Sequence, residues 1–323
     1  MAGIYIHIPF CKQACHYCNF HFSTSLALKN DFTAALLKET GLRSDYLGKD
    51  SVGTIYLGGG TPSLLSEPDI TGILQNLYRH FSVRKDAEIT LEANPDDVSP
   101  PALNGWKRAG INRLSLGVQS FFPEDLQWMN RAHDEKQAIH SILDAQSAGL
   151  DNISIDLIYG LPTLTDKRWR ENIAKAVSLE IPHLSCYALT VEPKTPLYKR
   201  IEQGKMQDIV PQDQARQFME GIQWLEESGY EQYEISNFAK PGKEITADAN
   251  YNYSKNSGRQ EIATQYYHPD NSPKGPVGQQ LSSNSGTTKY FTAQTDYANP
   301  ITDKMKIEAG LRGAIRNYNS ENE

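Results

Sequence analysis

The stretch Cys11-Lys-Gln-Ala-Cys15-His-Tyr-Cys18 holds three of the four cysteines of this 323-residue chain within eight residues. A secreted disulfide framework spreads its cysteines along the chain, so disulfide bonding explains this grouping poorly. Ligation by thiolates in a reducing compartment explains it better. Three thiolates at this spacing can hold a [4Fe–4S] cluster and leave one iron without a protein ligand, open to the amino and carboxylate groups of S-adenosylmethionine (SAM). A structural zinc site with His16 or His21 as fourth ligand is the alternative.

Short runs of β-branched and aromatic residues recur along the chain, and stretches with helical periodicity separate them. The runs are Ile4–Ile8, Val52–Leu57, Glu88–Glu92, Asn112–Val118, Ile153–Ile158 and Leu184–Thr190. Strands that alternate with helices predict an α/β fold with a parallel sheet, either open or closed into most of a barrel. In both cases the functional residues are expected at the C-terminal ends of the strands.

The second predicted strand runs directly into Gly58-Gly59-Gly60-Thr61-Pro62. Glycines at such a position let the backbone approach a ligand that a Cβ atom would block, although a glycine run is often no more than a tight turn. No Gly-Lys-Ser/Thr follows, so the run is not a phosphate-binding P-loop.

These motifs, taken in order, resemble the oxygen-independent coproporphyrinogen III oxidase family of radical SAM proteins. The resemblance covers about residues 2 to 243 and rests on Tyr5-Ile-His-Ile-Pro-Phe-Cys11, the cysteine loop, the Gly-Gly-Gly-Thr-Pro turn, Glu92-Ala-Asn-Pro95, Arg113-Leu-Ser-Leu-Gly-Val-Gln119-Ser, Asn130-Arg-Ala-His133 and Asp156-Leu-Ile-Tyr-Gly-Leu-Pro162. It implies a radical SAM partial (β/α)6 barrel. It also implies that the cofactor, rather than acid–base residues, supplies the chemistry by forming a 5′-deoxyadenosyl radical from SAM.

The resemblance assigns roles to individual residues. Cys11, Cys15 and Cys18 are expected to ligate the cluster, and no catalytic residue is assigned. The residues expected near SAM are Tyr5, Tyr17, Gly59, Gly60, Thr61 and Glu92, and those matching a second SAM position in the decarboxylase branch are Gln119, Arg131, Asp156 and Ala188. Structural roles remain open for several of these: a strand-end carboxylate for Glu92 or Asp156, a helix-end ion pair for Arg131 and an interior hydrogen bond for Gln119.

Within the family, the sequence favours the HemW-type heme chaperone branch, because Phe20 stands where the decarboxylase branch has a further cysteine and the first ligand is already residue 11. The expected function is to bind [4Fe–4S], SAM and heme as cargo and to pass heme to an acceptor protein. A flavodoxin- or ferredoxin-type electron donor is expected. Oxidative decarboxylation of coproporphyrinogen III is the alternative function, and a radical SAM methyltransferase is a weaker one, so enzymatic activity is left open.

Composition limits the class of protein. The net charge of −7 and pI near 5.7 argue against a large positively charged surface that would bind nucleic acid or an anionic membrane. No run approaches the roughly 18 apolar residues of a spanning helix. The N-terminus, Met-Ala-Gly-Ile-Tyr-Ile-His-Ile-Pro, lacks the basic and long apolar regions of a signal peptide. A cytoplasmic location is therefore predicted.

The sequence changes character near residue 244. Members of the heme chaperone branch continue into a His-Asn-x-x-Tyr-Trp motif implicated in heme binding, and this chain does not. From Ile245 to Glu323, Leu, Ile, Val and Phe make up nine of 79 residues. The prediction is a radical SAM core over residues 1–243, a low-complexity, disordered segment over 244–288 and a β-hairpin tail over 289–323 that is foreign to the family. The tail resembles a fragment of an outer-membrane TonB-dependent receptor, and no stable membrane insertion is expected from two strands.

Overall fold

The computed structural model describes residues 2–244, 249–264, 278–302 and 305–322. The chain divides into two compact units, residues 1–245 and 246–323. In the described part, no helix is long and apolar enough to cross a membrane.

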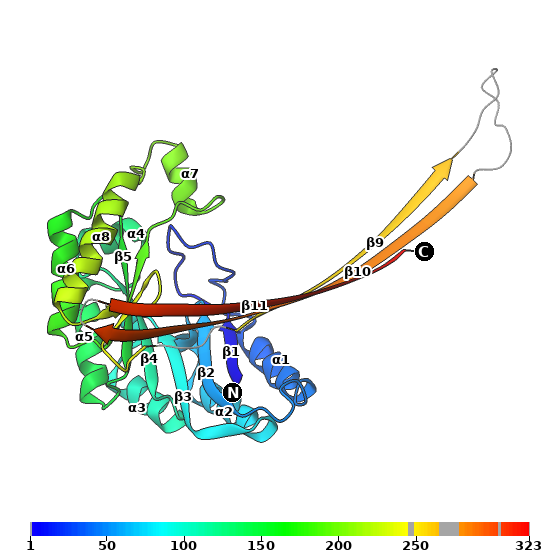
Figure 1. Cartoon of the computed structure of the whole chain (residues 1–323), viewed down its shortest axis with the longest axis horizontal. Coiled ribbons are helices and arrows are strands. Elements are labelled where there is room, and N and C mark those ends of the chain that lie inside the picture. Colours follow the sequence, from blue (N-terminus) through cyan, green and yellow to red (C-terminus); the bar gives the residue numbers. More distant parts are fainter. Residues whose placement is uncertain (1, 245–248, 265–277, 303–304, 323) are drawn as a thin grey trace, which may run out of the picture. The chain divides into compact units, whose positions relative to one another are not determined.

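The first unit is built on six parallel strands that follow one another in chain order across the sheet (Figure 1). They are β1 (Ala2–Ile8), β2 (Val52–Gly59), β3 (Val83–Ala93), β4 (Arg113–Gln119), β5 (Ile153–Tyr159) and β6 (His183–Ala188). Each falls on a run that the sequence predicts, β3 beginning five residues earlier and β6 ending two residues earlier. The partial (β/α)6 barrel expected from the sequence is therefore confirmed. Two short strands, β8 (Asn237–Ala239) and β7 (Glu231–Gln232), extend the sheet antiparallel beyond β6.

Helices connect the parallel strands and lie along the outside of the sheet (Figure 1). They are α1 (Lys29–Leu42), α2 (Glu67–His80), α3 (Pro100–Ala109), α4 (Pro123–Met129), α5 (Glu135–Ser147), α6 (Asp166–Ser178), α7 (Pro196–Glu202) and α8 (Pro211–Glu227), with 3₁₀ turns at Pro62–Leu64 and Pro95–Asp97. Several begin where the sequence supplies an N-cap: Ser66 and Asp69 form a capping box at α2, as do Asp134 and Gln137 at α5.

The alternation of side chains along each strand separates the core from the site. On β5, Ile153, Ile155 and Leu157 are completely buried. Because successive side chains point to opposite faces, Ser154 and Asp156 lie on the other face of the same strand. The apolar face packs against the helices, and the polar face lines the inside of the curved sheet.

The second unit is a three-stranded antiparallel sheet of β9 (Ala249–Thr264), β10 (Gly278–Thr302) and β11 (Met305–Asn322). Strand β10 is central, with Gly286 opposite Asn256 on β9 and Ser320 on β11. Strand β9 and the first part of β10 fall within residues 244–288, and the disorder that the composition predicts for this segment stays a prediction. Residues 245–248 and 265–277 of that segment lie outside the described residues. Threonine and tyrosine, frequent in this region, favour extended backbone even where little apolar surface can be buried.

We expect Trp169→Ala to lower the free energy of unfolding by about 3–5 kcal/mol, because it removes a fully buried indole. Trp169 is 1% exposed on α6, donates from Nε1 to the Gln217 carbonyl at 2.9 Å and lies 5.5 Å from the Tyr159 ring. Denaturant unfolding followed by circular dichroism measures the change. Trp224→Ala, at a half-buried position on α8, is the control and should cost clearly less; equal losses would contradict this account of the core.

Candidate active site

The predicted site residues gather where the parallel strands end. The cysteine loop follows β1, the glycine turn ends β2, Glu92 lies near the end of β3, and Gln119 ends β4. Asp156 lies in the middle of β5 and Ala188 ends β6. Carboxyl ends of neighbouring parallel strands share one rim of the sheet, so residues up to 180 positions apart come together there.

The cysteine loop is closed at its base and anchored in its middle. Near its start, the amide of Cys11 donates to the carbonyl of Ser23 at 3.0 Å, and the amide of Ser23 donates to the carbonyl of Pro9 at 2.8 Å. Its middle docks on the end of α4. There Asn130, in the left-handed conformation that asparagine tolerates (φ 58°), donates to the carbonyl of Ala14 at 2.8 Å.

A salt bridge adds a further anchor. The ammonium group of Lys12 lies 2.9 Å from Asp96 and also contacts Asp97, both in the 3₁₀ turn after β3. The loop that carries the three cysteines is therefore positioned by side-chain and backbone contacts on two separate elements.

The three thiols are free, half-buried and close enough to influence one another's charge. Burial raises the pKa of Cys11 and of Cys18, and Cys15 adds to the effect in both cases. Ionising them in this setting is costly unless a cation compensates. Iron supplies such positive charge, so the donor set suits an iron–sulfur cluster.

Arg131 is the positive charge that the protein itself places beside the thiols. Its guanidinium donates to Cys15 Sγ at 3.2 Å, to Asn94 Oδ1 at 2.7 Å and to the carbonyl of Gly117 at 2.8 Å. Although burial opposes the charged form, Tyr17 and Cys15 hold the pKa of Arg131 above its ordinary value. Its Nε is buried without a partner. The helix-end ion pair considered from the sequence is thus not its role.

The glycine turn is required by the close approach of the cysteine loop. A Cβ atom on Gly60 would lie 2.6 Å from the carbonyl oxygen of Phe10 and 3.0 Å from Cys11 Sγ. Gly59 has φ +115°, a conformation that side chains rarely adopt. Thr61, which follows, is buried and accepts from Asn94 Nδ2 at 3.2 Å. The turn therefore brings residues 59–61 directly beneath the thiols.

Glu92 connects the turn to the inside of the barrel. One carboxylate oxygen accepts from the amide of Gly59 and the other from the hydroxyl of Tyr56, both at 2.9 Å. Burial raises the pKa of Glu92, while these two hydrogen bonds oppose the rise. Tyr5, which stacks on Tyr56 with ring centroids 5.9 Å apart, has its pKa raised to about 12, first by burial and then by Glu92.

Asp156 lies deeper in the barrel. Burial, followed by the charge of Glu92, raises its pKa to about 7, while Arg131 and Arg113 act in the opposite direction. Gln119 is buried and has a positive φ of 69°. Ala188 lies exposed at the end of β6. The structure thus places Asp156 within electrostatic reach of both Glu92 and Arg131.

Sequence reasoning missed Tyr56, Asn94 and Asn130 as residues that build the site. Tyr56 could have been found from strand periodicity, because it shares a face with Gly58 two residues later. Asn94 lies inside the quoted motif Glu92-Ala-Asn-Pro95 without a role having been assigned to it. The bond from Asn130 to Ala14 joins residues 116 apart, and no local pattern reveals it.

One of the two histidines considered as the fourth ligand of a zinc site, His16, is engaged elsewhere. His16 is buried, and its Nδ1 lies 3.0 Å from the carbonyl oxygen of Trp128. Burial lowers the pKa of His16. Throughout the residues that the structure describes, no three His, Cys, Asp or Glu side chains converge closely enough to hold a single metal ion.

Comparison with known proteins gives two family matches. Residues 5–176 match the family described as Radical SAM superfamily. Residues 236–323 match the family described as Outer membrane protein beta-barrel family.

Several curated proteins and one solved structure are similar to this chain over three quarters of its length or nearly so. The heme chaperone HemW of Bacillus subtilis is 37% identical over 295 residues, which are 90% of this chain and 75% of that protein. The heme chaperone HemW of Escherichia coli is 39% identical over 256 residues, 77% of this chain and 65% of that protein. The coproporphyrinogen III oxidase HemN of Escherichia coli, described as a radical SAM enzyme, superposes with a TM-score of 0.67 at 30% identity and covers 74% of this chain and 56% of its own.

We expect Cys11→Ala, Cys15→Ala and Cys18→Ala each to abolish retention of an iron–sulfur cluster after anaerobic reconstitution, since each removes one of three protein ligands. Iron and sulfide content and the visible absorption of the cluster measure the loss. Cys186→Ala is the matched control: Cys186 is buried within β6, away from the loop, and its variant should keep the cluster. A loop variant with full iron content would contradict the assignment.

Asp156→Asn should remove part of the pH dependence of stability. The folded state raises the pKa of Asp156 from 3.8 to about 7, so it holds the proton more tightly than the unfolded chain. The stability of the wild-type protein should therefore fall as pH rises from about 4 through about 7, by ~2 kcal/mol between pH 5 and pH 8. Denaturant unfolding of both proteins at the two pH values measures it; the same pH dependence in both would contradict the prediction.

Proposed function

The chain belongs to the radical SAM superfamily and, within it, to the heme chaperone HemW family, and from this we propose that it binds heme and passes it to an acceptor protein. The observation that carries the proposal is the 37% identity to the Bacillus subtilis chaperone over 75% of that protein's length. The chain spans about 65% of the Escherichia coli chaperone, so the activity of a whole protein of this kind is itself part of the proposal.

The site suits the cofactors of the superfamily. Cys11, Cys15 and Cys18 would hold a [4Fe–4S] cluster. The residues that would bind SAM are Tyr5, Tyr17, Gly59, Gly60, Thr61 and Glu92, and those that match the positions of a second SAM are Gln119, Arg131, Asp156 and Ala188. When bound, the cluster supplies one-electron reduction of SAM. The protein's own part is to shield the thiols, to place Arg131 beside Cys15 and to exclude water by packing Tyr17 against the core.

An electron donor of the flavodoxin or ferredoxin type and an acceptor for heme complete the proposal. The cytoplasmic location predicted from the sequence belongs with it. We further propose that the radical SAM unit is joined near residue 243 to a segment foreign to the family. The division of the chain at residue 245 and the separate family match over residues 236–323 support this.

Decarboxylation of coproporphyrinogen III is the second candidate function. The likeness to the oxidase HemN favours it, at 30% identity and over 56% of that chain. Phe20 favours the chaperone function instead. This exposed side chain lies two residues after Cys18, at the position where the decarboxylase branch has a cysteine.

One experiment separates the two candidates. The full chain, with its cluster reconstituted anaerobically, is titrated with heme while the Soret band is followed, and is also incubated with coproporphyrinogen III, SAM and a reductant. We expect saturation at one heme per chain and no decarboxylated product. Formation of decarboxylated product would favour the oxidase function. A titration in which heme binding does not saturate, although the cluster is intact, would overturn the chaperone proposal.

A further inference from the structure

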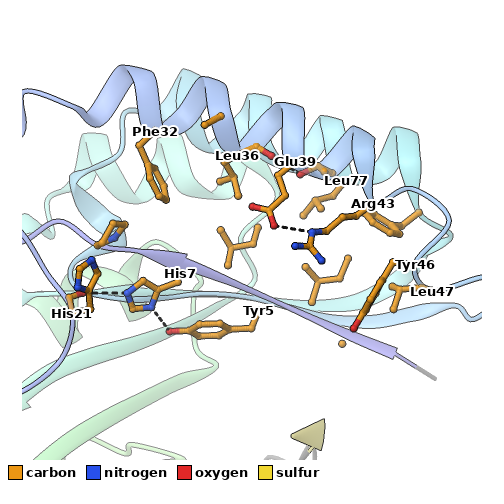
Figure 2. A pocket seen from close by; sticks show the side chains of 17 residues that line it. Tyr5, His7, His21, Phe32, Leu36, Glu39, Arg43, Tyr46, Leu47 and Leu77 are labelled. Carbon is orange, nitrogen blue, oxygen red and sulfur yellow. Dashed lines mark hydrogen bonds and ion pairs between the residues drawn. The ribbon is translucent and has the colours of Figure 1, made fainter. Parts of the chain in front are cut away.

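A groove with a volume of about 760 Å³ lies between β1 and α1 and borders the site described above, with which it shares Tyr5 (Figure 2). Its size falls in the range of roughly 300–1,000 Å³ that is usual for sites of small organic ligands. Strand β1 forms the edge of the eight-stranded sheet, with β2 as its neighbour. The groove therefore runs beside the edge strand of this sheet.

The walls of the groove are mostly apolar. Phe32 and Leu36 reach into it from α1, and Leu77 and Phe81 contribute from α2 and the residue after it. Ile4 and Ile6 line it from β1. An apolar slot of this kind favours a flat hydrophobic ligand, because the face that the ligand lays against the walls leaves water on binding.

Polar groups stand at the two ends of the slot (Figure 2). At one end lie His7 and His21, and at the other lie Tyr46 and the ion pair of Arg43 with Glu39, whose atoms are 2.8 Å apart. From Phe32 to Arg43, α1 rises by about 16 Å, so the two polar ends are well separated.

The two histidines differ in how they are engaged. One ring nitrogen of His7 lies 3.3 Å from the Tyr5 hydroxyl, and the other lies 3.2 Å from the carbonyl oxygen of His21. The His21 ring is exposed, and within the described residues no group hydrogen-bonds to it. A nitrogen lone pair of His21 is therefore available to a ligand that enters the groove.

We propose that this groove is a heme site, with one face of the macrocycle against the apolar walls, His21 as the axial ligand of the iron on the other face and Arg43 paired with a propionate. The proposal rests on the proposed function and adds the location of the cargo. Histidine is a common axial ligand of heme iron, and arginine pairs with carboxylates in two parallel hydrogen bonds. The pair of Arg43 with Glu39 is more than half exposed, so a propionate can exchange with it at small cost.

The test uses the full chain with a reconstituted cluster and ferric heme as the probe. Ala35 and Ala34 are neighbours on α1 and both exposed, but only Ala35 lines the groove. Ala35→Trp should fill the slot and weaken heme binding by roughly tenfold or more, whereas Ala34→Trp should bind as the wild type does. Unaltered circular dichroism and cluster content verify that both variants are folded.

Two further variants examine the ends of the groove. His21→Ala should change the Soret maximum and the spin state of bound heme, while His140→Ala, on the exposed surface of α5, should change neither. Arg43→Ala should weaken binding of heme but not of heme dimethyl ester, whose propionates carry no charge.

The outcomes keep the two proposals apart. If the wild type shows no saturable heme binding, the proposed function fails and the heme site fails with it. If the wild type binds heme and Ala35→Trp and His21→Ala bind it with unchanged affinity and spectrum, the groove is not the site and the chaperone function stands.

Discussion

The site depends on one steric constraint, the passage of the Gly58–Gly60 turn directly beneath the cysteine loop. With a Cβ atom on Gly60 2.6 Å from the Phe10 carbonyl, no other residue could occupy that position without moving the loop. The same turn points the amide of Gly59 at Glu92. The constraint thus fixes together the loop that carries the thiols, the end of β2 and a buried carboxylate on β3, which are the parts between which a cofactor would lie.

Charge is the second determinant of this region. Three thiols, Glu92 and Asp156 are crowded into a space where burial disfavours every negative charge, and the raised pKa values of Cys11, Cys18, Glu92 and Asp156 all reflect this. Arg131 offsets part of the cost by bonding to Cys15 and lying near Tyr17 and Asp96. One guanidinium cannot balance so many acids, so the arrangement is suited to bind additional positive charge, which an iron–sulfur cluster would bring.

The sequence predicted those features that depend on local pattern. All six parallel strands could be located, because apolar runs alternate with helical stretches. It did not predict contacts between distant residues, such as Asn130 with Ala14, or Arg131 with Asn94 and Gly117. These depend on how the sheet curves. The composition of residues 244–288 indicated a poor core, and the strands described there rely on pairing along the backbone.

Strand β1 shows how one edge of a fold can serve two sites. Ile6 and Ile8 are buried against the helices, whereas Tyr5 and His7 alternate with them on the open side. A Cβ atom on Gly59 would lie 2.6 Å from the His7 ring, so that ring touches the glycine turn, while its Nε2 lies beside the carbonyl of His21 at the end of the groove. The imidazole of His7 is therefore common to both regions. Only the His7 side chain would separate a heme in the groove from the glycine turn. Cargo and cofactor would then lie on opposite sides of β1.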